Sequence, residues 1–146
     1  MPDLSNENGQ LYQVVGGKIK VLVVDDEKLI RWSLTKGLEG AGYAVDTAVD
    51  GEDAVQLMAS SKYDVVVTDL KMPGLSGIDL LKKIKEYEHN LPVIFLSAYL
   101  SKEVIDDAIH YGAYSCISKP FQMENILHII KDALEFRSNQ GQCANG

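Results

Sequence analysis

The stretch that decides the fold is Asp64-Val65-Val66-Val67-Thr68-Asp69-Leu70-Lys71-Met72-Pro73-Gly74. Its first half is the most β-branched segment of the chain, which favours a strand over residues 64–68. An acid at the carboxyl end of a buried strand, just before a Pro-Gly turn, is poorly placed for core packing and well placed for a binding or catalytic role. Asp69 is therefore the first candidate site residue.

Three further apolar runs also end in polar or charged residues. Val21–Val24 is followed by Asp25-Asp26-Glu27, Val93–Leu96 is followed by Ser97, and the run around Cys116-Ile117 is followed by Ser118-Lys119-Pro120. Continuous apolar runs of this length are typical of strands that are covered on both faces, as in a parallel sheet. The question is whether the strands deliver these groups to one edge.

The predicted elements alternate between strand and helix. Strands are expected over 19–24, 44–48, 64–68, 92–97 and 114–118. Helices are expected from 26 or 27 to 39, over 51–60, from 76 or 77 onward, and over 101–111 and 123–136. Trp32, in the first helix, is expected to be half-buried. This alternation predicts an α/β fold with a doubly wound, five-stranded parallel sheet. The strand order 2-1-3-4-5 would bring Asp25, Asp26 and Asp69 together at the carboxyl ends of the strands, where such sheets bind ligands.

Composition limits the class of protein. A length of 146 residues fits one domain, and 46% hydrophobic residues suffice for a core. A net charge of −7 argues against nucleic-acid binding by this chain. Two cysteines and the lack of a long apolar run indicate reduced thiols in a cytoplasmic protein with no membrane association. Residues 1–17 are predicted to be a flexible leader, 18–137 the folded domain and 138–146 a flexible tail.

The predicted edge has the parts for phosphoryl transfer. Carboxylates that converge to about 4 Å repel by on the order of 4 kcal/mol per pair at an effective dielectric near 20, so a proton or a cation is needed among them. A set of oxygen ligands without His or Cys selects Mg²⁺, or another hard ion such as Mn²⁺. Lys119 is a second cation and Ser97 offers a hydroxyl. A carboxylate nucleophile in such a setting gives an acyl phosphate on Asp69.

Four motifs in order resemble the receiver domain of two-component response regulators, which has a flavodoxin-like fold. They are Leu22-Val23-Val24-Asp25-Asp26-Glu27, Thr68-Asp69-Leu70-Lys71-Met72-Pro73-Gly74, Leu96-Ser97-Ala98 and Ser118-Lys119-Pro120-Phe121. The resemblance covers about residues 18–136 and implies that Asp69 accepts phosphate from the phosphohistidine of a sensor histidine kinase. It also implies Mg²⁺ ligation by Asp25, Asp26, Asp69 and the backbone carbonyl of Lys71, with Asp25 acting directly or through water.

The resemblance assigns the remaining site residues. Ser97 is the expected switch hydroxyl, and Lys119 the expected site lysine, followed by a cis bond to Pro120. Cys116 stands where the family usually has an aromatic switch residue, which leaves the coupling between Ser97 and the output surface open. Lys71 and Tyr99 occupy two variable positions that, in the family, tune the lifetime of the phosphoryl group.

The resemblance also implies an output. The domain is expected to catalyse only its own phosphorylation and dephosphorylation, and so not to be an enzyme. Phosphorylation would switch the surface formed by the helix 101–111, the strand 114–118 and the helix 123–136. That surface would control an output domain or partner, with transcription the expected process, and could form a homodimer. The segment Leu29-Ile30-Arg31-Trp32-Ser33-Leu34 resembles receivers of the nitrogen-regulation type, which precede an ATPase domain that activates sigma-54 polymerase.

Three other functions are weighed against this one. A flavin-binding electron carrier of similar topology needs a phosphate loop rich in hydroxyls and amides after the first strand, whereas Asp25-Asp26-Glu27 repels phosphate unless a metal is bound. A phosphatase with an Asp nucleophile would have a DxDx(T/V) motif after the first strand, and this motif is absent. The last alternative is a stand-alone or degenerate receiver that serves only as an interaction module, and the intact acid cluster argues against degeneracy.

Overall fold

The computed structural model describes the backbone of residues 17–145 and the side chains of residues 17–137. The strands are β1 (Lys20–Val24), β2 (Ala44–Ala48), β3 (Val65–Asp69), β4 (Val93–Ser97) and β5 (Ser115–Ser118). The helices are α1 (Lys28–Gly40), α2 (Gly51–Ser60), α3 (Gly77–Tyr87), α4 (Lys102–His110) and α5 (Met123–Asn145). All strand pairs are parallel, in the order β2-β1-β3-β4-β5, as predicted.

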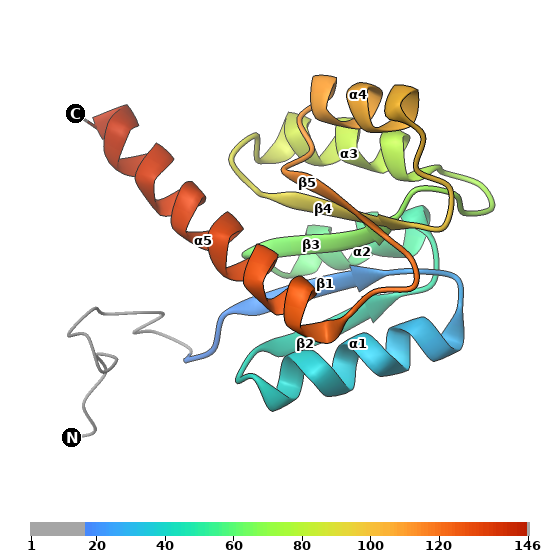
Figure 1. The fold of residues 1–146 in the computed structure, drawn as a ribbon. Helices are drawn as coiled ribbons and strands as arrows, with labels where there is room; N and C mark the ends of the chain where they lie inside the picture. Colours follow the sequence, from blue (N-terminus) through green and yellow to red (C-terminus); the bar gives the residue numbers. More distant parts are fainter. Residues whose placement is uncertain (1–16, 146) are drawn as a thin grey trace.

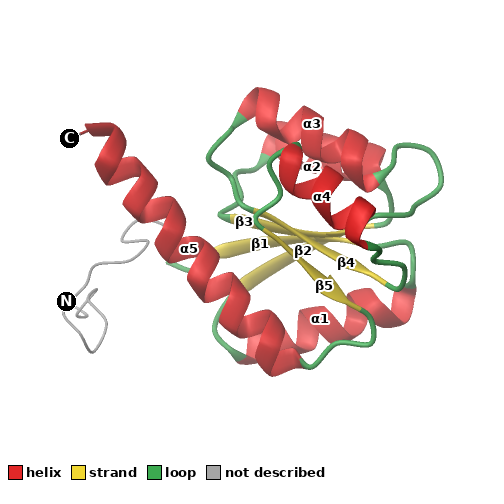
Figure 2. Cartoon of the chain, turned by 45° about the horizontal axis from the view of Figure 1, so that its top comes forward, coloured by secondary structure: helices red, strands yellow, loops and turns green. Residues whose placement is uncertain are grey.

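The sheet lies between two helical layers (Figures 1 and 2). Successive residues of a strand face opposite sides, so each strand supplies both layers. On β1, Val21 and Val23 pack with Leu34 of α1 and with residues of α5. Leu22 and Val24 belong to the cluster on the other face, which α2, α3 and α4 cover. The strands are therefore buried on both sides, which explains their continuous apolar runs.

The loop after β3 is held close to the sheet by Gly77, the first residue of α3. Its N–H donates to the carbonyl of Leu70 at 2.9 Å. A Cβ at this position would lie 2.8 Å from Leu70 Cα and 2.9 Å from Phe95 Cε1, so only glycine allows the approach. Ser76 caps the same helix by accepting the N–H of Asp79 at 3.1 Å. The end of β3 is thereby fixed against the start of α3.

The opposite end of β3 is held by Asp64. Its Oδ2 accepts the N–H of Lys20 at 2.8 Å. Arg137 of α5 donates to the Asp64 carbonyl at 3.3 Å, and lies 3.5 Å from its Oδ1. Arg137 also contacts Glu88 Oε2 at 3.2 Å, so one guanidinium joins α5 to β3 and to the end of α3. These contacts lie at the amino end of the strand that carries Asp69.

Two predictions about the helices differ from the structure. Helix α5 continues to Asn145, whereas its end was predicted near Phe136. The predicted tail is thus helical backbone through Asn145; it contains no proline, and one Gly costs a helix only about 1 kcal/mol. Trp32 is 59% exposed because it lies off the stripe that Leu34 and Leu38 of α1 bury.

The predicted leader lies outside the described residues except for Gly17, and its flexibility and that of the tail stay predictions. Within residues 17–145, no helix has the length and apolar character needed to cross a membrane.

Candidate functional site

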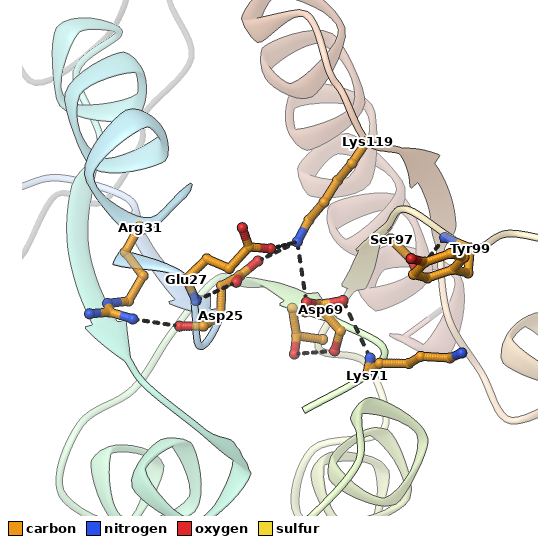
Figure 3. A network of polar contacts seen from close by, with 9 residues as sticks. Asp25, Glu27, Arg31, Asp69, Lys71, Ser97, Tyr99 and Lys119 are labelled. Atoms are coloured by element: carbon orange, nitrogen blue, oxygen red, sulfur yellow. Dashed lines mark hydrogen bonds and ion pairs between the residues drawn. The ribbon is translucent and has the colours of Figure 1, made fainter. Parts of the chain in front are cut away.

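The carboxyl ends of the strands bring a lysine into contact with three carboxylates (Figure 3). Lys119 Nζ lies 2.9 Å from Asp25 Oδ2 and 3.2 Å from Asp69 Oδ2. It also lies 3.3 Å from Glu27 Oε1. Asp25 follows β1 and Asp69 ends β3, and these strands are neighbours in the sheet. Lys119 follows β5, two strands from β3, and its long side chain reaches the acids.

Asp25 is fixed by its own turn. Its N–H donates to the carbonyl of Ala48 at 3.1 Å, and its Oδ1 accepts the N–H of Glu27 at 2.9 Å. Arg31 of α1 donates from Nη1 to the Asp25 carbonyl at 2.9 Å. These contacts leave Oδ2 directed at Lys119, and the residue is 1% exposed.

Asp69 is fixed in a similar way. Its Oδ1 accepts the N–H of Lys71 at 3.3 Å, while Oδ2 faces Lys119. The hydroxyl of Thr68 donates to the Asp69 carbonyl at 3.0 Å. Asp69 is 7% exposed, so its carboxylate lies at the edge of the buried sheet and remains reachable from solvent.

The charges at this edge oppose the effect of burial. Burial raises the pKa of Asp25, and the hydrogen bonds from Lys119 and from the Glu27 N–H offset only part of that rise. For Lys119, burial alone would lower the pKa, but the interactions with Asp25 and Asp69 outweigh it and raise the pKa above its ordinary 10.5. Lys119 is therefore a stable ammonium at neutral pH, and it compensates the acids around it.

The acids also form a set of oxygen donors suited to a metal ion. Asp25, Glu27 and Asp69 each offer an oxygen, and these atoms lie within 4.8 Å of one another. Oxygen donors of this kind fit a hard divalent cation such as Mg²⁺. Asp26, which the sequence placed in this set, is exposed and does not belong to the cluster. Glu27, from the same acidic run, supplies the third oxygen instead.

Ser97 ends β4 beside Asp69 but is turned toward its own loop. It is 1% exposed, and its Oγ accepts the N–H of Tyr99 at 3.2 Å. In the described part of the chain, no hydrogen bond joins Ser97 to Asp69. The carbonyl of Ser97 accepts the N–H of Lys119 at 2.9 Å, which ties the end of β4 to the end of β5. The Lys119–Pro120 bond is cis, as the sequence resemblance implied.

Cys116 lies on β5 opposite Phe95 of β4. It is partly buried and packs against the cluster on the α2–α3–α4 face. Burial raises the pKa of its thiol. The position where the family usually has an aromatic residue is thus occupied by a small, neutral side chain on the sheet. Sequence reasoning missed one contact beside the site. Lys71 Nζ lies 4.8 Å from the ring centroid of Tyr99.

The fold and this constellation define a class of signalling domain. Residues 21–131 match the family model of the response regulator receiver domain, and the chain belongs to that family.

Relatives and solved structures agree with this assignment. The DNA-binding transcriptional regulator NtrC of Escherichia coli K12 is 35% identical over 125 residues, which cover 86% of this chain and 27% of NtrC. The sporulation initiation phosphotransferase F of Bacillus subtilis is 33% identical over 120 residues, covering 82% of this chain and 97% of that protein. The chain therefore spans about a quarter of the NtrC relative and nearly all of the shorter one.

Two solved structures show the same fold. NtrX from Brucella abortus, solved with ADP, has a TM-score of 0.83 and 31% identity, over 87% of this chain and 29% of that one. A receiver domain protein from Clostridium thermocellum has a TM-score of 0.79 and 31% identity, over 84% of this chain and 98% of that one.

Proposed function

We propose that Asp69 accepts a phosphoryl group from the phosphohistidine of a sensor histidine kinase. The observation that carries this proposal is the convergence of Asp69 with Asp25 and with Lys119, whose Nζ lies 3.2 Å from the Asp69 carboxylate. Membership of the receiver family favours this function over a flavin-binding electron carrier and over a phosphatase. The domain would then modify only itself, and it is not proposed to turn over other substrates.

The chemistry is a transfer between two groups. A carboxylate oxygen of Asp69 forms a bond to phosphorus while the phosphorus–nitrogen bond of the donor breaks and the imidazole leaves with the electron pair. The structure supports positioning as the main contribution, because hydrogen bonds from Lys71 and Lys119 orient the two oxygens of Asp69. Lys119 would remain as a cation beside the new phosphoryl group, where it offsets the added negative charge.

A divalent ion is the second part of the proposal. The proposed ligands are Asp25, Asp26, Asp69 and the backbone carbonyl of Lys71, with Mg²⁺ or Mn²⁺ bound. Asp26 would have to turn inward, because Glu27 supplies the third oxygen of the cluster in this conformation. When bound, such an ion neutralises charge on the transferring phosphoryl oxygens.

The output is proposed to be control of transcription through α4, β5 and α5, either in a larger protein or through a partner. The support is the similarity to NtrC, a DNA-binding transcriptional regulator. The same surface is proposed for a homodimer, and the acidic chain itself is not proposed to bind nucleic acid. A cytoplasmic location follows from the same proposal, since the kinase domain that supplies phosphate would act there.

The test is direct phosphorylation. Wild-type protein incubated with a small phosphodonor and Mg²⁺ is expected to gain one phosphoryl group by intact mass, and Asp69→Asn is expected to gain none. Asp79→Asn is the matched control, since Asp79 is an exposed acid in the first turn of α3 and should leave the adduct unchanged. An unmodified wild type, or an equal adduct on Asp69→Asn, would refute the proposal.

A further inference from the structure

Two loops at the carboxyl edge of the sheet are joined by a contact that the proposed phosphoryl transfer does not use. Lys71 lies on the loop between β3 and α3, and Tyr99 lies on the loop between β4 and α4. Lys71 Nζ is 4.8 Å from the centroid of the Tyr99 ring, a cation–π distance (Figure 3). Since β3 and β4 are neighbours, this contact joins the loops at the carboxyl ends of two adjacent strands.

Each of the two residues is also tied to the functional side chain of its own strand. The N–H of Lys71 donates to Asp69 Oδ1 at 3.3 Å. The N–H of Tyr99 donates to Ser97 Oγ at 3.2 Å. A chain of contacts therefore runs from Asp69 through Lys71 and Tyr99 to Ser97. It connects the proposed phosphoacceptor with the hydroxyl that is expected to respond to it.

Core packing does not explain the position of Tyr99. Its side chain is 69% exposed, and Lys71 is exposed as well. Leu100 anchors the same loop to the core cluster, whereas the Tyr99 ring contributes little buried area, and Lys71 is the cation that it contacts. The Lys71 ammonium, in turn, is directed at the ring, while Asp69 Oδ2 is already paired with Lys119. Tyr99 thus places an aromatic ring at this edge from the β4–α4 loop, whereas β5 carries Cys116.

We propose that Lys71 and Tyr99 form a latch that holds the β4–α4 loop, and with it Ser97, in the conformation of the unphosphorylated protein. This inference rests on the proposed phosphorylation of Asp69. A phosphoryl group there adds roughly 1.5 to 2 negative charges two residues from Lys71. The ammonium then has a stronger partner than the ring, leaves it, and frees the loop so that the Ser97 hydroxyl can turn toward the phosphoryl oxygens. Both side chains act as positioning groups.

The first test uses beryllofluoride with Mg²⁺ as a stable mimic of the phosphoryl group. Affinity is measured for wild type, Tyr99→Leu, Lys71→Met and the double variant. Tyr99→Leu is expected to bind about two- to fivefold more tightly when Lys71 is present, which is the ratio that corresponds to an exposed cation–π contact. The same substitution in the Lys71→Met background is expected to change nothing, because the latch is already open. An equal effect of Tyr99→Leu in both backgrounds, or no effect in either, would overturn the latch.

A matched control is available on α3. Tyr87 is 70% exposed, as Tyr99 is, and belongs to no ring or cation contact in the described part of the chain. Tyr87→Leu should leave the affinity for beryllofluoride unchanged with either residue at position 71. A Tyr87→Leu effect as large as that of Tyr99→Leu would contradict a role specific to Tyr99.

The second test needs neither metal nor phosphoryl mimic. Amide hydrogen exchange is followed at the N–H of Tyr99, which the latch is expected to protect through Ser97 Oγ. Lys71→Met should speed this exchange about two- to fivefold, while the N–H of Val104, held by the Ser101 cap, stays unchanged. Unchanged exchange at Tyr99 would overturn the latch. Wild type that fails to bind beryllofluoride contradicts the proposed function alone, and the exchange result then decides the latch.

Discussion

The ammonium of Lys119 lies within 3.3 Å of oxygens from three carboxylates, and two of those acids are buried. Lys119→Met keeps the bulk of the side chain but leaves Asp25 and Asp69 facing one another without a cation. We expect the metal-free variant to lose on the order of 2 kcal/mol of unfolding free energy. We also expect Mg²⁺ to stabilise it more than wild type, because the ion no longer competes with the ammonium.

Urea denaturation with and without Mg²⁺ measures both effects. Lys36→Met is the control, since Lys36 is exposed on α1 and takes part in no ion pair among the described side chains. A Lys119→Met protein that gains no more from Mg²⁺ than wild type would contradict the assignment of Lys119 as the cation at this site.

The raised pKa of Asp25 determines how its contribution to the unfolding free energy changes with pH. Burial raises the pKa of its carboxyl above the ordinary 3.8. Just above pH 3.8 the folded protein therefore keeps a proton that the unfolded chain has released, and the contribution of Asp25 to stability falls as the pH rises through this interval. Lys119 stays charged throughout, so it does not change the sign.

The measurement is the unfolding free energy of wild type minus that of Asp25→Asn, followed upward from pH 3.8 without metal. The difference is expected to decrease and then become constant above the raised pKa. The exposed acid variant Asp79→Asn should give no such trend. A difference that grows with pH in this interval would show that the pKa of Asp25 is lowered on folding.

The acidic run after β1 shows how far the sequence can specify a site. The positions of Asp25 and Asp69 follow from strand ends and strand order, and both lie where they were predicted. Which neighbour of Asp25 reaches Lys119 does not follow, because that depends on hydrogen bonds across the turn. The Glu27 N–H binds Asp25 Oδ1 and Arg31 binds its carbonyl, and this arrangement leaves Asp26 in solvent.

At the scale of single elements, the start of α3 is closely packed against backbone and a buried ring. Gly77→Ala would place a methyl group 2.8 Å from Leu70 Cα and 2.9 Å from Phe95 Cε1. Neither neighbour can move freely, since one is backbone and the other a fully buried ring. We expect a loss of about 1–3 kcal/mol of unfolding free energy. A lower yield of phosphoryl adduct should accompany it, because the added methyl group would also meet the backbone oxygen of Asp69.

Gly40→Ala provides the comparison. Gly40 is the last residue of α1, and a Cβ there meets nothing within 4 Å. Alanine is expected to leave stability unchanged or to raise it by up to about 1 kcal/mol, because it favours the helix. Equal losses in the two variants, measured by denaturation, would show that Gly77 is not closely packed.

The bounds of the elements were predictable where packing creates a pattern. The β-branched run of β3 and the apolar spacing of α1 are imposed by burial, so they can be read from the residues. The end of α5 was not predictable, because its last turns carry polar residues with no apolar period. Trp32 shows the same limit: the stripe that faces the sheet was evident, but the exposure of a large side chain beside the stripe was not.

At the scale of the whole molecule, the sheet separates two cores. Ile84 of α3 belongs to the cluster on one face, and Ile130 of α5 belongs to the cluster on the other. Each Ile→Val substitution is expected to cost about 0.5–1.5 kcal/mol. The double variant should lose the sum to within about 0.5 kcal/mol, since the two sites share no partner. Denaturation of the four proteins tests this. A coupling well above that value would mean that the two layers respond to each other through the strands.

The contacts at the two ends of β3 have a mechanical consequence. Asp64 is held by Lys20 and Arg137 at one end, and Asp69 by Lys119 at the other. A slide of one residue, roughly 3.3 Å, would break both sets and turn every inward side chain outward. These contacts therefore oppose any shift of β3 along its own axis, including a shift caused by a charge added to Asp69. If Asp69 is phosphorylated as proposed, we expect the strand to stay in place and the displacement to pass through the segments that follow the strand ends, such as the loops 70–76 and 98–101.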